Sequence, residues 1–487
     1  MKTKTLLTVI LLSIILVSCA LASIPTPTET PVPTATITLT PVPPTPTATT
    51  EPMFTIGDEQ IPVRLIDSAI PPFINAMKAV EINLSVEQIK TGLVVQKLVD
   101  YQGNPFHVVV TSNTGDSLAD GIPLLLAEQK KGTWQWKSIG LNALGEKAGM
   151  PIGITLWYKD NKGNVITDNN NEYDRIVREN FSIATLDSGI AWKWLEPTPG
   201  GQMDKWSVGD MKGQLEQAKS FDNITRLRLH AILWAQQYPD WLSGLSADEA
   251  NTAMIRRIEY LANKYKGIVQ EVVVVNEPYY SGSFFVGNGS FTRPDTLYDK
   301  FGQNYLVTAF AKARELFGVD VKLIYNDKAN HSLKYDWNGG YTKATQKNTA
   351  LLAEQGLIDY VGMQTHLDAK YPPSADDIIQ TIQAYKVPVV ITELDVRLDS
   401  LAANVSKANR LKIQAQIYTT VIEAAIKSGN VKEISFGQVG DKYSWFVEWM
   451  GSPNANGMLF DNEYNPKLSY YAVLKEFLHQ VEQVQPK

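Results

Sequence analysis

Short apolar runs of strand length recur along the chain and alternate with segments of helical periodicity. They are "PIGITLWY" (151–158), "FSIATLDS" (181–188), "ITRLRLHAIL" (224–233), "EVVVVNEP" (271–278), "VKLIYND" (321–327), "IDYVGMQTHL" (358–367), "VPVVITELDV" (387–396) and "EISFGQVGD" (433–441). Strands that are apolar along their whole length are typical of parallel sheets covered by helices on both faces. Eight such units in succession predict an α/β protein with a (β/α)8 TIM barrel.

An open, doubly wound sheet is the main alternative for this pattern. It would carry a glycine-rich phosphate-binding loop after its first strand, and no such loop follows "PIGITLWY". The intervening segments have the start and stop signals of helices, since one opens on Ser246 and two others close on Gly318 and Gly429. These features favour the closed barrel.

The N-terminus has the features of a processing segment. "MKTK" followed by "LLTVILLSIILV" predicts a signal peptide over residues 1–18. Cys19, the one cysteine in the chain, completes "LVSC", which resembles the lipobox of bacterial lipoproteins, in which the cysteine is lipidated. The alternative is a cysteine that merely closes a signal sequence. Residues 19–52 are rich in Pro and Thr and predict an extended linker, so we expect an extracellular, cell-surface lipoprotein.

Residues 53–138 predict a small N-terminal α+β module to which the sequence assigns no role. Within it, "INLSVEQIKTGLVVQKLV" (82–99) predicts a helix leading into a strand. "PFHVVVTSNTGD" (105–116) predicts a strand followed by a turn.

The charge composition of the chain indicates which classes of binding partner to expect. The net charge of -6, with no block of like charge, argues against nucleic acid and limits the expected membrane contact to the lipid anchor. We expect no cofactor, because no cluster of His, Asp or Glu has metal-ligand spacing.

Polar residues end several of the predicted strands, where a buried strand should carry none. They are His230, Asn276, Glu277, Asn326, Asp327, Gln364, His366, Glu393, Asp395 and Asp441. The C-terminal strand ends of a (β/α)8 barrel form its active-site face, so we expect these side chains to line a cleft.

Two of these residues, Glu277 and Glu393, end the fourth and seventh strands, and a closed barrel would bring them face to face. A single strand-end glutamate more often caps a helix or pairs with an arginine, but two on matching strand ends favour chemistry. Paired carboxylates without a thiol or a nucleophile-elbow serine point to glycoside hydrolysis. In its retaining form the two carboxyl groups lie about 5–5.5 Å apart.

Seven motifs in order carry a resemblance to a known family. They are "LHAILWAQQYPDWL", "VVNE", "VKLIYND", "VGMQTHL", "ITELD", "DKYSW" and "LFDNEYNPKLSYYAV". Together they resemble glycoside hydrolase family 10, the retaining endo-β-1,4-xylanases, over roughly residues 138 to 482. The resemblance implies a catalytic barrel over 139–482 and a polysaccharide substrate, xylan or a related β-glycan.

The resemblance also implies roles for individual residues. Glu277 would be the general acid/base, Glu393 the nucleophile, and Asn276 a hydrogen-bond partner of the sugar 2-hydroxyl. His366 would hold the Glu393 carboxylate, and Asp395 would fix that histidine. The subsite around the scissile bond would be lined by His230, Trp234, Gln364 and Trp445, although core packing would account equally well for a histidine or a tryptophan taken alone.

The chain departs from the family pattern at four positions around the expected glycone side. Ser188 and Ala191 stand where the family has Asn and Lys, Ala235 where it has His, and Gly437 where it has Trp. Lys193 is a candidate substitute for the missing Lys. The exact glycan and chain-length preference therefore stay open. The alternatives are a glycanase of the same clan acting on another β-glycan and a non-catalytic glycan-binding lipoprotein.

Overall fold

The computed structural model describes residues 51–160, 162–166, 171–187, 189–200, 205–278, 297–302, 304–334 and 340–483. The predicted signal peptide, Cys19 and nearly all of the predicted linker lie outside these ranges, as does Ser188. From Glu51 onward the chain forms one compact unit. Among the described residues, no helix has the length and apolar character that a membrane span requires.

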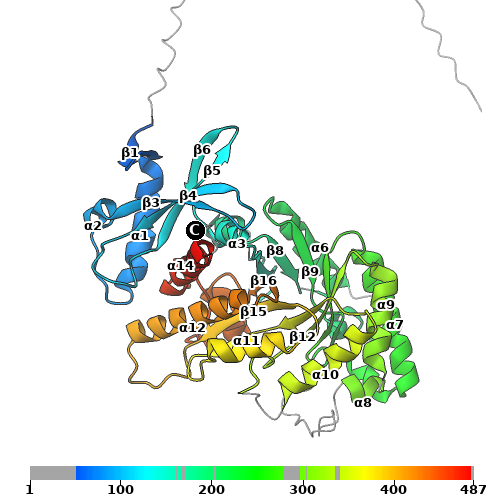
Figure 1. Cartoon of the computed structure of the whole chain (residues 1–487). Helices are drawn as coiled ribbons and strands as arrows, with labels where there is room; N and C mark the ends of the chain where they lie inside the picture. The colour runs from blue at the N-terminus through cyan, green and yellow to red at the C-terminus, as the bar shows by residue number, and fades with distance from the viewer. Residues whose placement is uncertain are drawn as a thin grey trace, which may run out of the picture. The chain divides into compact units, whose positions relative to one another are not determined.

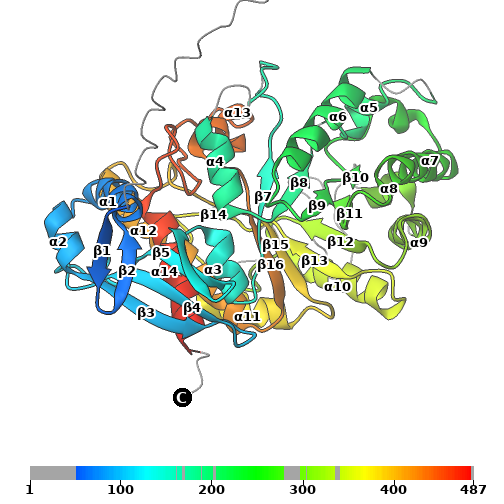
Figure 2. The same ribbon diagram turned by 90° about the horizontal axis from the view of Figure 1, so that it is seen from above.

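Eight parallel strands close into a barrel, which confirms the predicted TIM-barrel fold (Figure 2). Each strand pairs with the next along the chain, and the last pairs with the first. They are β7 (Ile152–Leu156), β8 (Ile183–Leu186), β9 (Arg226–Leu229), β11 (Glu271–Asn276), β12 (Lys322–Asp327), β13 (Tyr360–Met363), β15 (Val389–Arg397) and β16 (Val431–Phe436).

Two predicted strands are interrupted in the structure. The run at 224–233 forms β9 and then, after a break, the two-residue strand β10 (Leu233–Trp234), which pairs with β11. The run at 358–367 divides into β13 and β14 (His366–Asp368), which pairs with β15. Thr365 between them has φ +60°, a left-handed conformation that a regular strand excludes. Both interruptions fall at the C-terminal ends of barrel strands, where the chain turns toward the cavity.

Helices alternate with the barrel strands and surround them (Figure 2). The longer ones are α4 (Asn171–Asn180), α6 (Lys205–Ser220), α7 (Ala247–Tyr265), α9 (Tyr305–Phe317), α10 (Tyr341–Glu354), α11 (Ala375–Gln383), α12 (Lys407–Lys427) and α14 (Leu468–Gln483). The shorter helical segments are α3 (Leu141–Lys147), which precedes β7, and α5 (Trp192–Leu195), α8 (Leu297–Phe301), α13 (Trp445–Glu448) and the 3-10 turns η1 (Asp240–Gly244) and η3 (Asp441–Tyr443).

The predicted helix signals act as expected. Ser246 caps α7, with its hydroxyl accepting from the Glu249 backbone N–H while the Glu249 side chain accepts from the Ser246 N–H. Gly318 ends α9 at φ +88°, a conformation open to glycine at little cost.

The valine side chains of β11 pack in two different parts of the core. Val273 packs with Ala231, Ile324 and Val390 in a separate small cluster drawn from several strands, as expected for the barrel interior. Val272 and Val274 belong instead to the main core that the helices share. Alternate side chains of one strand thus fill the barrel and anchor the helix layer, which explains why the run is apolar throughout.

A buried ionic cluster lies near the N-terminal end of β11. The side chain of Arg228 is fully buried, and its Nε and Nη2 each lie 2.8 Å from Glu271 Oε2. The same guanidinium contacts Glu433 of β16. Arg226 Nη1 lies 3.1 Å from both glutamates, so the two arginines neutralise the two carboxylates. This cluster links three barrel strands on the interior.

The N-terminal module is built on an antiparallel sheet. It is ordered β3 (Leu93–Val99), β4 (Pro105–Thr111), β5 (Pro123–Lys130) and β6 (Thr133–Ser138). The predicted helix-to-strand segment is confirmed as α2 (Val86–Thr91) followed by β3, and the predicted strand at 105–116 as β4. The structure adds β5, β6, α1 (Val63–Lys78) and the hairpin of β1 (Met53–Ile56) and β2 (Glu59–Pro62), which the sequence did not predict.

The module packs against the last helix of the barrel. Figure 1 shows its blue-to-cyan strands beside α14, and α14 contacts β3, β5 and α1. Lys475 of α14 donates to the carbonyl oxygens of Ser117 at 2.9 Å and Asp120 at 2.6 Å. The domain limits 53–138 and 139–482 stay predictions, since both segments belong to one compact unit.

The buried ionic cluster generates a stability prediction. We expect Arg228→Met to lower the free energy of unfolding by about 3–5 kcal/mol, because it leaves buried carboxylates without their most buried cation. Arg175→Met is the matched control, since Arg175 pairs with two glutamates of α4 on the exposed surface and should change the same quantity by less than about 1 kcal/mol. Denaturant titration followed by circular dichroism measures both. Equal effects of the two substitutions would contradict the prediction.

Candidate active site

A cavity of about 500 Å³ opens at the C-terminal ends of the barrel strands. Seven of the residues predicted for the site line it together: His230, Trp234, Glu277, Gln364, His366, Glu393 and Trp445. Asn276 and Asp395 are fully buried directly behind this lining and bond to it. The structure therefore brings together all nine residues to which the family resemblance gives a role in the cleft.

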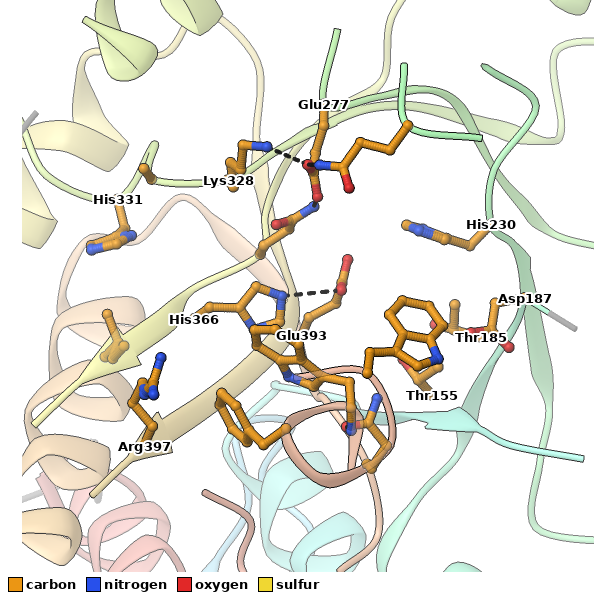
Figure 3. A pocket seen from close by; sticks show the side chains of 18 of the residues that line it. Thr155, Thr185, Asp187, His230, Glu277, Lys328, His331, His366, Glu393 and Arg397 are labelled. Carbon is orange, nitrogen blue, oxygen red and sulfur yellow. Dashed lines mark hydrogen bonds and ion pairs between the residues drawn. The ribbon is translucent and has the colours of Figure 1, made fainter. Parts of the chain in front are cut away.

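Glu393 of β15 is held by donors on two sides. Its Oε1 accepts a hydrogen bond of 3.0 Å from Asn326 Nδ2, and its Oε2 lies 3.3 Å from His366 Nε2 (Figure 3). His366 Nδ1 lies 2.8 Å from Asp395 Oδ2, which also accepts a 2.8 Å bond from Trp445 Nε1. These interactions form a continuous chain from Trp445 through Asp395 and His366 to the Glu393 carboxylate.

The pKa values within this chain follow from burial and charge. Burial raises the pKa of Glu393, but the bonds and charge of His366, the charge of His230 and the Asn326 amide lower it to about 2. Burial lowers the pKa of His366, but the two flanking carboxylates raise it to about 10. Burial also raises the pKa of Asp395, against the opposing effect of His366 and Trp445. The arrangement pairs an ionised Glu393 with a protonated imidazole at neutral pH.

Glu277, directly after β11, is held by three donors. Gln364 Nε2 donates to its Oε1 at 2.9 Å, and Gln236 Nε2 donates to its Oε2 at 2.9 Å. Lys328 Nζ lies 2.5 Å from the same Oε2 (Figure 3). The side chain of Glu277 is buried, so little of this carboxyl group is left to solvent.

Two side-chain amides connect the glutamates through Asn276. Asn326 Nδ2 donates both to Glu393 Oε1 and, at 2.8 Å, to Asn276 Oδ1. Gln364 Nε2 donates both to Glu277 Oε1 and, at 3.2 Å, to the same Asn276 oxygen. Asn276 Oδ1 is thus the shared acceptor that ties the supports of both carboxylates together. Its Nδ2 is buried and has no hydrogen-bond partner among the described residues, so it is free to donate to a ligand.

The backbone is strained where three strands reach the cavity. Glu277 has φ +43°, Ala329 has φ +51° and Thr365 has φ +60°, and they follow β11, β12 and β13. Left-handed conformations are uncommon for residues other than glycine and persist where the surroundings fix them. At Glu277 this conformation turns the side chain out of the strand's alternation and toward the cavity.

Two polar strand-end residues expected in the cleft do not line the cavity. Asp327 is fully buried, and its Oδ2 accepts a hydrogen bond of 3.1 Å from the Thr345 hydroxyl. Asp441, expected in the cleft, is buried away from it, with its Oδ2 2.9 Å from Lys467 Nζ and its Oδ1 accepting from the Met458 N–H at 2.8 Å. That expectation was wrong because η3 turns this residue toward the closing segment of the chain. Asp441 fastens the segment before α14 to the end of β16.

Other lining residues were missed by the sequence reasoning. They are Thr155, Trp157, Thr185, Asp187, Gln236, Lys328, Tyr341, Tyr371 and Gln438 among others. Several lie in or just after predicted strands, so their place at the strand end was a usable signal. What the sequence did not show is which side of the strand each side chain takes.

The departures from the family pattern are small residues packed at the site. Ala191 and Ala235 are buried. A Cβ added at Gly437 would lie 2.9 Å from Asp395 Oδ2, so a larger side chain there requires Asp395 to move. Lys193 does not line the cavity, and its ammonium lies 4.8 Å from the centre of the exposed Trp194 ring. It therefore does not replace the lysine expected at position 191.

The cavity side chains do not form a metal centre. Within the described ranges, no three or more His, Cys, Asp or Glu side chains are arranged to hold a metal ion.

The raised pKa of His366 generates a pH-dependent stability prediction. Its bound proton stabilises the fold fully below its ordinary pKa of 6.5, and this stabilisation is lost as pH rises through about 10. The lowered pKa of Glu393 has the opposite effect: its contribution to the stability of the fold is lost only as pH falls from 4.5 through about 2. The difference in Tm between the wild type and His366→Gln should be largest at about pH 6 and shrink by about 2 °C or more by pH 10. Thermal melts across this range test it, and a difference that stays constant would refute it.

Comparisons with known proteins cover the barrel. The sequence model of glycosyl hydrolase family 10 matches residues 140–476. The chain is 27% identical over 352 residues to Endo-1,4-beta-xylanase A of Humicola insolens, covering 69% of this chain and 86% of that protein. It is 28% identical over 314 residues to Endo-1,4-beta-xylanase 2 of Aureobasidium pullulans, covering 61% and 80%.

Solved structures share the fold. Native xylanase 10B of Thermotoga maritima matches with a TM-score of 0.60 and 24% identity, over 71% of this chain and all of that one. Penicillium canescens endo-1,4-beta-xylanase XylE matches with a TM-score of 0.59 and 25% identity, over 70% and 98%. The family match spans most of the chain and confirms the resemblance seen in the motifs. The chain belongs to glycosyl hydrolase family 10, and it is a glycoside hydrolase.

Proposed function

We propose that the protein is an endo-acting β-1,4-xylanase that cleaves its substrate by double displacement with retention of configuration. The observation that carries this proposal is the placement of Glu277 and Glu393 on one cavity, supported by one amide network. The descriptions of the relatives as endo-1,4-beta-xylanases support xylan as the substrate.

In the first step Glu393 acts as the nucleophile. Its pKa of about 2 keeps it ionised, and a carboxylate oxygen attacks the anomeric carbon while the bond from that carbon to the leaving oxygen breaks. Glu277 acts as the general acid and gives its proton to the leaving oxygen. The protonated His366 and the Asn326 amide hold the attacking carboxylate in one orientation.

In the second step water replaces the enzyme at the anomeric carbon. Glu277, now a carboxylate, takes a proton from the water as its oxygen bonds to that carbon. The bond to Glu393 breaks, and its carboxylate is restored. Glu277 ends the cycle protonated, and both glutamates regain their starting states.

The remaining predicted residues act in binding the sugar. Asn276 Nδ2, buried without a partner in the described chain, is placed to donate to the sugar 2-hydroxyl, a contact that strengthens as an oxocarbenium-like state forms. Trp234 and Trp445 offer ring faces, and His230 and Gln364 offer polar atoms. Beyond them, Trp157 stacks on Trp449 with ring centroids 5.9 Å apart, and the exposed Trp449 extends the platform toward solvent.

A glycanase acting on another β-glycan is the second candidate. The small residues Ala191, Ala235 and Gly437 favour it, because they remove side chains from the expected glycone side. Several lost contacts of about 0.5–1.5 kcal/mol each would redirect substrate choice while sparing the catalytic pair. A non-catalytic glycan-binding role is opposed by the two supported glutamates.

Catalysis by the two glutamates is tested by substitution. We expect Glu393→Ala and Glu277→Gln to reduce hydrolysis of xylan at least about 100-fold, because each removes a group that reacts in the first step. Reducing-end release measures the rate, and proton NMR of the first-formed product should show retained configuration at the anomeric carbon. If both variants cleave like the wild type, the protein does not use this pair.

The substrate is tested with a panel of polysaccharides. Xylan should be cut faster than mannan or mixed-linkage glucan by the wild type. The opposite order would assign the protein to another β-glycan, and binding of xylan without cleavage by the wild type would support the non-catalytic alternative.

We also propose that the enzyme is held at the cell surface by a lipid on Cys19, with residues 19–52 as the spacer. The "LVSC" motif after the apolar run supports this. Cys19→Ser should move the protein from the membrane fraction to the soluble fraction, with unchanged activity on xylan. Unaltered fractionation of this variant would exclude lipid anchoring through Cys19.

A further inference from the structure

Lys328 makes the one ionic contact that the described residues give to Glu277. It follows β12 and lines the same cavity, with its ammonium 2.5 Å from Glu277 Oε2. Figure 3 shows Lys328 and His331 on one side of the two glutamates and His230, Asp187, Thr185 and Thr155 on the other. Lys328 therefore faces the two glutamates from the wall opposite His230 and Asp187.

The surroundings keep this ammonium charged and directed. Burial lowers the pKa of Lys328, but the charge and hydrogen bond of Glu277 raise it in net. Its neighbour Asp327 bonds to Tyr325, Thr345 and the Lys328 backbone, and burial raises the pKa of Asp327 to about 7. The Tyr341 ring, whose centre lies 6.0 Å from the ammonium, is the other group it faces. Glu277 is thus the carboxylate with which the Lys328 ammonium forms its ion pair.

We propose that Lys328 is a positioning residue that selectively assists the first chemical step by stabilising the carboxylate left on Glu277 as its proton departs. This inference rests on the proposed role of Glu277 as acid/base. Gln236 and Gln364 already orient the carboxyl group through neutral hydrogen bonds. What Lys328 adds is a full positive charge, which interacts more strongly with the ionised than with the neutral form of its partner.

The charge acts oppositely in the two steps. In the first step the proton moves from Glu277 to the leaving oxygen and the anomeric C–O bond breaks, so negative charge develops beside the ammonium and is stabilised. In the second step Glu277 takes a proton from water and loses its charge, so the same ammonium opposes the change. Lys328 therefore favours substrates whose leaving group needs protonation, as the sugar of a polysaccharide does.

A series of aryl β-xylobiosides tests this. Dinitrophenolate departs without a proton, whereas phenolate and the sugar leaving group of xylan need one. We expect Lys328→Met to leave kcat/KM for the dinitrophenyl substrate within about 3-fold of the wild type, and to lower kcat/KM for the phenyl substrate and xylan by about 10- to 100-fold. Lys328→Arg, which keeps the charge, should restore most of the loss.

Matched variants separate this role from a structural one. Lys370→Met removes the positive charge of an exposed lysine beside Tyr371, another lining residue. This variant should have the same kcat/KM as the wild type for every substrate of the series. Lys328→Gln keeps a hydrogen bond without the charge and supplies a second test if Lys328→Met does not fold, as judged by circular dichroism. It should behave as Lys328→Met.

The failures of the two proposals are distinguishable. Equal losses on all leaving groups, or none on any, would overturn the role of Lys328 while leaving that of Glu277 intact. Glu277→Ala serves as the reference, because removing the acid itself should give the steepest dependence on the leaving group. If Glu277→Ala shows no such dependence, the proposed function fails and this inference fails with it.

Discussion

Closure of the eight-strand barrel is the constraint on which the site depends. The last strand, β16, pairs with the first, β7, and the ring so formed collects the C-terminal ends of distant strands around one cavity. Glu277 and Glu393 reach it from β11 and β15, which are separated by β12 and β13. Asn326 at the end of β12 and Gln364 just after β13 donate to Glu393 and Glu277, respectively. Both amides also donate to Asn276 Oδ1 and so connect the two glutamates. The polar pair after the valines of β11 is therefore where a fully buried strand reaches the cavity at the C-terminal end of the barrel.

The two carboxyl groups differ because their neighbours differ. Glu393 faces an imidazole that Asp395 and Trp445 hold in place, and its pKa of about 2 keeps it a carboxylate. Glu277 sits in a left-handed backbone conformation among two amides and an ammonium. Glu393 is held by an imidazole and one amide, whereas Glu277 is held by two amides and an ammonium. Such a division of environments is what separates nucleophile from acid/base in a two-carboxylate reaction.

The sequence sufficed for the barrel because most of the strands are predominantly apolar and alternate with segments of helical periodicity. It also sufficed for most of the cleft residues, since burying a polar side chain at the end of such a strand is costly unless it reaches a cavity or a partner. It did not suffice for Lys328 or Gln236, which lie past the strand ends, where backbone turns decide the direction of the side chain. The same limit explains Asp441, a strand-end residue that η3 redirects toward Lys467. In the N-terminal module, two prolines inside α1 concealed a helix that packing stabilises.

One departure from the family pattern, Gly437, is tied to the network around Glu393. Gly437 leaves no room for a side chain, because its Cβ would meet the Asp395 oxygen that lies close to His366 and Trp445. The same Asp395 oxygen accepts the hydrogen bond from Trp445 and occupies the space that a side chain at 437 would need. A tryptophan at 437 would therefore require Asp395 to move and its bond with Trp445 to change. The wall opposite Lys328 carries three short polar side chains, which place hydrogen-bonding atoms along the cavity: Thr155, Thr185 and Asp187. This wall therefore offers hydrogen-bonding atoms at a distance from the amide network around Asn276 that supports the two glutamates.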